Sequence, residues 1–224
     1  MIQALFLDFD GVVAVTGSYH IAAWREVFSP LGIQVAPMDV YLREGSSANN
    51  IGRSILEKND LHLSEERIQE LISKKREFYN HHTKAKLQDG VEELVATAKS
   101  KELKVALVTG SRWNSIRTVL KEPFRSEFDL LITADNVSRN KPYPDPYLKA
   151  AEKIGVAPHQ CLVVENAPYG IQAAKAAGMK CVAIQSTLPE EHLQGADWIF
   201  TDLREMLHQF DLILNHTAPV ETVA

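Results

Sequence analysis

The chain has 224 residues, of which 45% are hydrophobic, and a formal net charge of −5. This length allows one large domain, alone or with a small insertion, and the apolar content supports a buried core. Lysine and arginine are scattered, which argues against a nucleic-acid-binding surface. No apolar run approaches the about 20 residues that a membrane-spanning helix needs. Asp8 and Asp10 interrupt the first apolar stretch, so no secretory signal is expected. We expect a cytoplasmic protein in which Cys161 and Cys181 are buried, reduced thiols.

Short apolar runs recur along the chain and predict the buried strands of a sheet. Strands are expected at residues 4–7, 104–108, 129–132, 161–164, 181–184 and 198–200. Helical patterns lie between them, at residues 91–100, 115–121, 147–154, 169–177 and 203–210. Strands that alternate with helices predict βαβ units and a parallel sheet.

The segment 16–86 breaks this alternation, because it is rich in helical periodicity and poor in strand signals. Ser64 is expected to cap a helix that runs to about residue 80. A segment of about 70 residues is too long for an ordinary crossover connection. The sequence therefore predicts an α/β fold. Residues 1–15 and 87–224 would form a Rossmann-like three-layer core with a parallel sheet, and residues 16–86 would form an inserted α-helical cap.

Two carboxylates, Asp8 and Asp10, directly follow the first predicted strand. At a separation of about 4 Å and an effective dielectric of about 20, two like charges repel by about 4 kcal/mol. A cation between them would make the pair tolerable. The alternative is a strand that ends at a solvated turn formed by Asp10 and Gly11.

Other polar residues follow other predicted strands, namely Thr109, and Glu165 with Asn166, while Lys141 lies in a proline-stiffened loop. Ligands of open α/β sheets bind at the C-terminal edge of the parallel strands. Oxygen ligands with excess negative charge suit a hard cation such as Mg²⁺, and an ammonium with a hydroxyl suits a phosphate. Taken singly, each residue has an ordinary explanation as a helix cap, a polar turn or a solvated loop residue. Their occurrence together, in this order along the chain, favours a single binding site for a cation and a phosphate.

That order resembles the haloacid dehalogenase superfamily over nearly the whole chain. The matching stretches are Asp8-Phe9-Asp10-Gly11-Val12, Val108-Thr109-Gly110-Ser111, Lys141-Pro142 and Val164-Glu165-Asn166-Ala167-Pro168-Tyr169-Gly170. The inserted segment is similar to the α-helical cap of the branch that includes β-phosphoglucomutase and many small-molecule phosphatases. The stretches 19–24 and 44–47 resemble that branch too.

The resemblance implies a two-step phosphoryl transfer. Asp8 would attack phosphorus and form an aspartyl-phosphate. Asp10 would protonate the leaving oxygen and then activate water. Thr109 and Lys141 would hold the oxygens of the transferring phosphoryl group.

The resemblance also implies a Mg²⁺ cofactor, bound by Asp8, by the main-chain carbonyl of Asp10, and by Glu165 and Asn166. Many relatives carry Asp at the position of Asn166. An amide oxygen can still bind Mg²⁺ but brings no charge. We therefore expect weaker metal binding than in an Asn166→Asp variant, without loss of activity.

The rest of the substrate is expected to contact the second motif and the cap. The residues are Gly110, Ser111, Arg112, His20, Trp24, Ser46, Asn49 and Lys75. His20, Trp24 and Lys75 match β-phosphoglucomutase, but the stretch 44–50 lacks the basic residues with which a mutase grips a second phosphate. We therefore predict a phosphatase that acts on a small phosphate monoester, such as a sugar phosphate. A sugar phosphomutase is the alternative.

Two other classes are weighed against these enzymes. A non-catalytic binding protein on the same fold would have lost Asp8, Asp10 or Lys141, and all three are present. A receiver-like signalling domain would have an open site without a long cap. We expect the partner to be a small-molecule phosphate ester rather than nucleic acid or membrane, the protein to be a monomer or weak dimer, and the cap to hinge near 15–18 and 84–89.

Overall fold

The computed structural model describes residues 1–215 and contains one six-stranded parallel sheet in the order β3-β2-β1-β4-β5-β6. The strands are β1 (Ala4–Leu7), β2 (Lys104–Val108), β3 (Leu130–Ile132), β4 (Cys161–Glu165), β5 (Lys180–Ile184) and β6 (Trp198–Phe200). The central strand β1 pairs with β2 on one side and β4 on the other. Polar residues at the ends of these three strands are thereby brought to one edge of the sheet.

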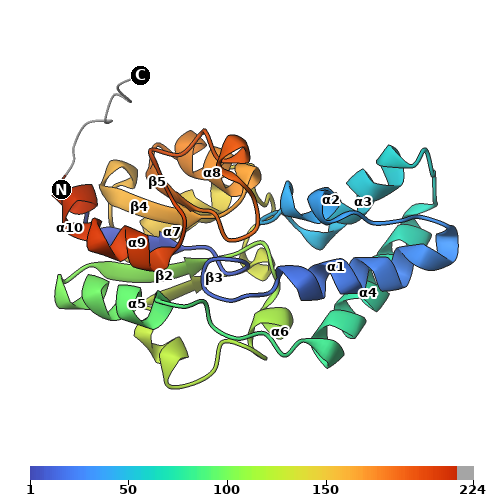
Figure 1. Cartoon of the computed structure of the whole chain (residues 1–224), viewed down its shortest axis with the longest axis horizontal. Coiled ribbons are helices and arrows are strands. Elements are labelled where there is room, and N and C mark those ends of the chain that lie inside the picture. The colour runs from blue at the N-terminus through green and yellow to red at the C-terminus, as the bar shows by residue number, and fades with distance from the viewer. Residues whose placement is uncertain (216–224) are drawn as a thin grey trace.

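Helices cover both faces of the sheet, which gives the three predicted layers (Figure 1). One face packs against α5 (Val91–Ser100), α9 (Leu203–His208) and α10 (Phe210–Asn215), and the other against α7 (Asp145–Ile154) and α8 (Pro168–Ala176). Neighbouring strand residues point to opposite faces, so Leu5 and Leu7 enter the first layer while Ala4 and Phe6 enter the second. The strands are buried on both sides, as expected for a parallel sheet. The predicted α/β fold is confirmed.

The segment after β1 forms helices that extend away from one end of the sheet (Figure 1). They are α1 (Gly17–Phe28), α2 (Pro37–Tyr41), α3 (Ala48–Lys58) and α4 (Glu65–His82). Their apolar faces form a separate cluster made only of residues between Ile21 and Ile72. Ser64 caps α4 as predicted, because its Oγ accepts a hydrogen bond from the backbone N–H of Arg67 at 3.3 Å.

The two chain segments that lead into and out of these helices run side by side. The N–H of Val15 donates to the carbonyl of Lys86 at 2.9 Å, and that of Gln88 donates to the carbonyl of Val13 at 2.9 Å. The proposed cap boundaries at residues 15/16 and 86/87 coincide with this pairing but stay a prediction, and so does hinge motion there. The last nine residues of the predicted core segment, 216–224, lie outside the described part of the chain.

Two predicted helices differ in extent from the observed ones. The helix expected at 115–121 is reduced to α6 (Trp113–Ile116), followed by turns and then Pro123. The helix expected at 203–210 is divided into α9 and α10. Short 3₁₀ segments lie at Ser29–Leu31, Phe124–Glu127, Ala134–Asn136, Pro158–Gln160 and Glu190–His192.

Cys161 and Cys181 are both buried and free, as expected. Within residues 1–215 there is no helix whose length and apolar content would carry it across a bilayer.

Trp24 does not lie where a substrate-binding residue would. Its side chain is 0% exposed, belongs to the apolar cluster of the cap and stacks on Phe28 with ring centroids 5.4 Å apart. The prediction of substrate contact is therefore wrong, because helical periodicity turns Trp24 into the cap interior. Its link to the site is indirect, since the ammonium of Lys75 lies 5.2 Å from the centroid of its ring.

This placement predicts a stability defect for Trp24→Ala. Truncating a fully buried aromatic side chain costs about 3–5 kcal/mol, so the free energy of unfolding measured by urea titration should fall by that amount. Trp113→Ala is the matched control, because Trp113 is only partly buried and should lose less. An equal or smaller loss for Trp24→Ala would contradict the placement.

Candidate active site

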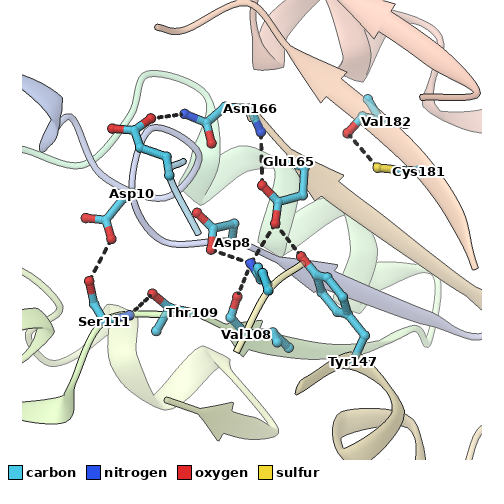
Figure 2. A network of polar contacts seen from close by, with 12 residues as sticks. Asp8, Asp10, Val108, Thr109, Ser111, Tyr147, Glu165, Asn166, Cys181 and Val182 are labelled. Carbon is cyan, nitrogen blue, oxygen red and sulfur yellow. Dashed lines mark hydrogen bonds and ion pairs between the residues drawn. The ribbon is translucent and has the colours of Figure 1, made fainter. Parts of the chain in front are cut away.

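A buried ammonium group lies between two carboxylates at the C-terminal edge of the sheet. Lys141 is 0% exposed, and its Nζ donates to Asp8 Oδ1 at 2.6 Å and to Glu165 Oε1 at 2.6 Å. Its third hydrogen bond goes to the carbonyl of Val108 at 2.9 Å. Asp8 follows β1, Val108 ends β2 and Glu165 ends β4. The strand order therefore brings the acidic residues together, as the sequence predicts, with one cation that partly offsets their charge (Figure 2).

Glu165 is fixed by three further features of the fold. The hydroxyl of Tyr147 donates to Glu165 Oε1 at 2.6 Å, and the N–H of Asn166 donates to Oε2 at 3.2 Å (Figure 2). A Cβ on Gly170 would lie 1.9 Å from the Glu165 carboxyl, so only glycine leaves room for it. Both oxygens of Glu165 thus accept hydrogen bonds, and Oε1 holds Lys141 in place. The predicted role of Glu165 as a metal ligand stays a prediction.

Asp10 is held by side chains from two other elements. Its Oδ1 accepts from Thr16 at 2.7 Å and contacts His20 Nε2 at 2.9 Å, while its Oδ2 accepts from Ser111 at 2.8 Å. Thr16 is the N-cap of α1, yet its hydroxyl makes no capping bond and goes to Asp10 instead. The start of the first cap helix is therefore used to position Asp10.

The surroundings shift the pKa values of the two aspartates in opposite directions. Burial raises the pKa of Asp8 to about 8, with Lys141 opposing the shift and Glu165 and Asp10 adding to it. Burial also acts to raise the pKa of Asp10, but His20 and the hydrogen bonds from His20, Thr16 and Ser111 outweigh it and lower the pKa. Asp10 is ionised in this arrangement, whereas Asp8 needs more positive charge nearby than Lys141 supplies.

His20 links Asp10 to the second buried ammonium of the site. Its Nδ1 lies 2.8 Å from Lys75 Nζ, and its ring stacks on Tyr79 with centroids 4.2 Å apart. Because the charged form of Lys75 can only donate, Nδ1 accepts from it and Nε2 carries the proton toward Asp10. Burial lowers the pKa of His20, and so does Lys75, so the ring is neutral near pH 7 and holds Asp10 as a hydrogen-bond donor.

Four buried side-chain oxygens around Asp8 and Asn166 have no hydrogen-bond partner: Asp8 Oδ2, Asn166 Oδ1, Glu44 Oε1 and Ser186 Oγ. Buried polar atoms are rarely left unpaired, and oxygens of this kind are the ligands that Mg²⁺ prefers. Asp8 and Asn166 therefore fit their predicted role. Within residues 1–215 no three His, Cys, Asp or Glu side chains converge as a metal cluster, and the set here is mixed, with an amide among the carboxylates.

The cap reaches this site through the loop after α2. Glu44 is 3% exposed, and its Oε2 accepts from Asn166 Nδ2 at 2.8 Å and from Thr187 at 3.1 Å. Burial raises its pKa well above the usual value, and Asp10 adds to the shift. A Cβ on Gly110 would lie 2.1 Å from the carbonyl oxygen of Gly45, so the second motif accepts the cap loop only because it carries glycine there. The structure therefore has the cap closed on the core.

A polar cavity of 380 Å³ lies between the cap and the core. Most of the predicted substrate-binding residues line it, namely Gly110, Ser111, Arg112, His20, Ser46, Asn49 and Lys75, together with Asp10. Asp8, Thr109 and Lys141 lie behind this surface, and the Thr109 hydroxyl accepts from the N–H of Ser111 at 3.0 Å.

Sequence reasoning missed several residues of the site. Arg76 and Arg139 line the cavity, although neither lies in one of the four motifs. Thr187 follows β5, so the rule that led to the other strand-end residues would also have found it. Glu44 lies in a stretch similar to the family's cap, but nothing in its local sequence indicates that the loop folds back onto β4. Nothing in the sequence around Tyr147 indicates a role in the site, since an aromatic residue on a helix most often packs in the hydrophobic core.

Comparison with known proteins agrees with this geometry. The model of the haloacid dehalogenase-like hydrolase family matches residues 5–184. Fructose-1-phosphate phosphatase YqaB of Escherichia coli is 36% identical over 186 residues, 81% of this chain and 95% of the relative. β-Phosphoglucomutase of Bacillus subtilis is 30% identical over 227 residues, 92% of this chain and 94% of the relative.

A solved structure of β-phosphoglucomutase from Clostridium difficile superposes with a TM-score of 0.83 at 27% identity, covering 96% of this chain and 97% of that one. The family match extends over most of the chain and includes the strand-end residues that form the site. The chain belongs to the haloacid dehalogenase-like hydrolase family.

Proposed function

We propose that the protein is a Mg²⁺-dependent phosphatase that hydrolyses a small phosphate monoester through an aspartyl-phosphate on Asp8. The observation that carries the proposal is the position of Asp8, bonded to buried Lys141 and two residues from Asp10, which lines the cavity. The phosphatase relatives support the reaction class. A sugar phosphate is the favoured substrate, because the relative from Escherichia coli is named for fructose 1-phosphate.

Mg²⁺ would be held by Asp8, Asn166 and Glu165, with the main-chain carbonyl of Asp10. When bound, it would supply positive charge that lowers the repulsion between the carboxylates and an anionic phosphate. The chain's own residues leave an excess of negative charge, since Asp8, Asp10, Glu44 and Glu165 are all buried and Lys141 is the fully buried cation among them.

In the first step, a carboxylate oxygen of Asp8 forms a bond to phosphorus while the ester P–O bond breaks. Asp10 gives the leaving oxygen its proton, and the alcohol departs. In the second step, Asp10 takes a proton from water, whose oxygen attacks the phosphorus and releases Asp8 as a carboxylate. The hydrogen bonds from Thr16, His20 and Ser111 suit Asp10 to the second step, and an anionic phosphate nearby favours the protonated form that the first step needs.

A sugar phosphomutase is the second candidate, and one observation favours it. Lys75, Arg76, Arg112 and Arg139 all line the cavity and could hold a second phosphate. The basic residues that flank the cap loop do not contribute: Arg43 donates to the carbonyl of Asp39, and Arg53 pairs with Glu65. Two of the cavity arginines also have acidic neighbours, Asp135 and Asp145, which reduces their charge toward a ligand.

A direct assay separates the two candidates. Phosphate release is measured with Mg²⁺ over a panel of sugar phosphates and nucleotides, and conversion of β-glucose 1-phosphate is measured in parallel with its bisphosphate as primer. The proposal expects phosphate release from at least one monoester. Conversion without net phosphate release would establish the mutase instead.

The variant Asp8→Asn tests the nucleophile. An amide oxygen cannot form the acyl phosphate, so kcat should fall by at least about 10⁴-fold, the scale for losing a catalytic carboxylate. Trapping with acid should recover phosphate on the wild-type chain and none on the variant. Asp211→Asn, an exposed carboxylate on α10, is the control and should keep full activity. Turnover that survives in Asp8→Asn would overturn the proposal.

Lys75 should make substrate binding depend on pH. Burial lowers the pKa of Lys75 to about 7, with Asp10 opposing and Arg76 reinforcing the shift. The side chain is charged below this pH and neutral above it, so KM for an anionic ester should rise by up to about tenfold per pH unit above pH 7.

The matched variants for this test are neighbours on α4. Lys75→Met should have a high KM at all pH values and no step near pH 7. Lys74→Met should behave as wild type, because Lys74 is exposed and pairs with Glu70. If KM of Lys75→Met rises with pH near pH 7 as it does in the wild type, the titrating group is not Lys75.

A further inference from the structure

Glu44 is a core-site carboxylate that comes from the cap. It is 3% exposed, although it belongs to a loop of the inserted segment, and it lies against Asn166, the first residue after β4. One of its oxygens is paired by Asn166 and Thr187, and the other, Oε1, has no partner. A buried carboxylate oxygen without a donor is costly, and a cation at this position would offset that cost.

Two more unpaired oxygens belong to the same group of residues. Asn166 Oδ1 and Asp8 Oδ2 are both buried and without partners, and both residues lie at the ends of neighbouring strands (Figure 2). The Asn166 amide is seated closely, because a Cβ on Gly11 would lie 2.1 Å from its Nδ2. The three residues come from core and cap, yet one chain of hydrogen bonds through Glu165 and Lys141 connects them.

The amide side chain of Asn166 explains why the carboxylate of Glu44, a residue of the cap, can lie in the core site. Asn166 donates through Nδ2 to Glu44, which leaves its Oδ1 for another partner. An aspartate in this place could not donate and would repel Glu44. The negative charge beside the amide of Asn166 is therefore supplied by a residue of the cap.

We propose that Glu44 is a ligand of the divalent cation, so that the metal site is complete only when the cap is closed. Asp8, Asn166 and Glu44 would each give it one oxygen. Metal binding and cap closure then favour each other, because the cation binds the closed form more tightly than the open one. This inference rests on the metal site of the proposed function and adds a coupling between that site and the cap.

The seat of the cap loop supports this coupling. Gly45 has φ of +81°, a conformation that glycine adopts readily, and directly follows Glu44. A Cβ on Gly110 would lie 2.1 Å from the carbonyl oxygen of Gly45, and a Cβ on Gly45 would lie 2.9 Å from Cδ of buried Lys141. The loop after α2 thus packs against Gly110 of the core, and this packing fixes the position of Glu44.

The test measures Mn²⁺ binding by calorimetry on the full chain, without substrate. Removing the charge in Glu44→Gln should weaken binding by about 10–100-fold, the scale for altering the shell of a metal site. Moving the charge back to the core in Glu44→Gln/Asn166→Asp should recover most of the affinity, since the new amide at position 44 can then donate to the new carboxylate at position 166. Glu57→Gln, an exposed glutamate of the cap, is the matched control and should bind as wild type.

Cap closure is read out separately by energy transfer between one dye on α3 and one on α5. Mn²⁺ should shorten the distance in the wild type and in Glu57→Gln but not in Glu44→Gln. Unchanged Mn²⁺ affinity in Glu44→Gln would overturn the inference and leave a phosphatase that depends on Asp8 untouched. A wild type that hydrolyses no phosphate ester, but binds Mn²⁺ and closes as stated, would overturn the proposed function and support the role of Glu44.

Discussion

The buried contact of Lys141 with Asp8 and Glu165 is the constraint on which the site depends. Two carboxylates next to β1 and β4 could not share a dry strand edge without it, and both distances to the ammonium are 2.6 Å. Lys141 uses all three donors within the protein. It can therefore offset part of the acidic charge and hold Asp8 in place, but it leaves Asp10 and Glu44 to be balanced by other groups.

The remaining charge is handled by contacts that join the cap to the core. Asp10 is held by Thr16 and His20 of the cap and by Ser111 of the core. Glu44 contacts Asn166 and Thr187. When the cap is closed, Thr16 and His20 therefore bring hydrogen-bond donors to Asp10, and Glu44 brings one more carboxylate to Asn166. This arrangement lines the cavity of 380 Å³ between cap and core with polar groups.

Much of this could be predicted from the sequence because it depends on local pattern. The six apolar runs have the period and length of buried strands, and the acidic residues stand at their C-terminal ends, where strand order brings them together. What could not be predicted depends on contacts distant in sequence. Glu44 and Asn166 are 122 positions apart, and no periodicity links them. Trp24 was misplaced for a similar reason, since a family motif does not say which face of its helix packs inward.

The central claim is that the buried acidic site needs a divalent cation held jointly by core and cap. Crystals grown with Mn²⁺ and measured at the manganese absorption edge test it most directly. The account predicts one strong anomalous peak within about 2.0–2.3 Å of oxygens of Asp8, Asn166 and Glu44, the range for hard divalent ions. No peak at this position with the cap closed, or a peak that Glu44 does not contact, would contradict it.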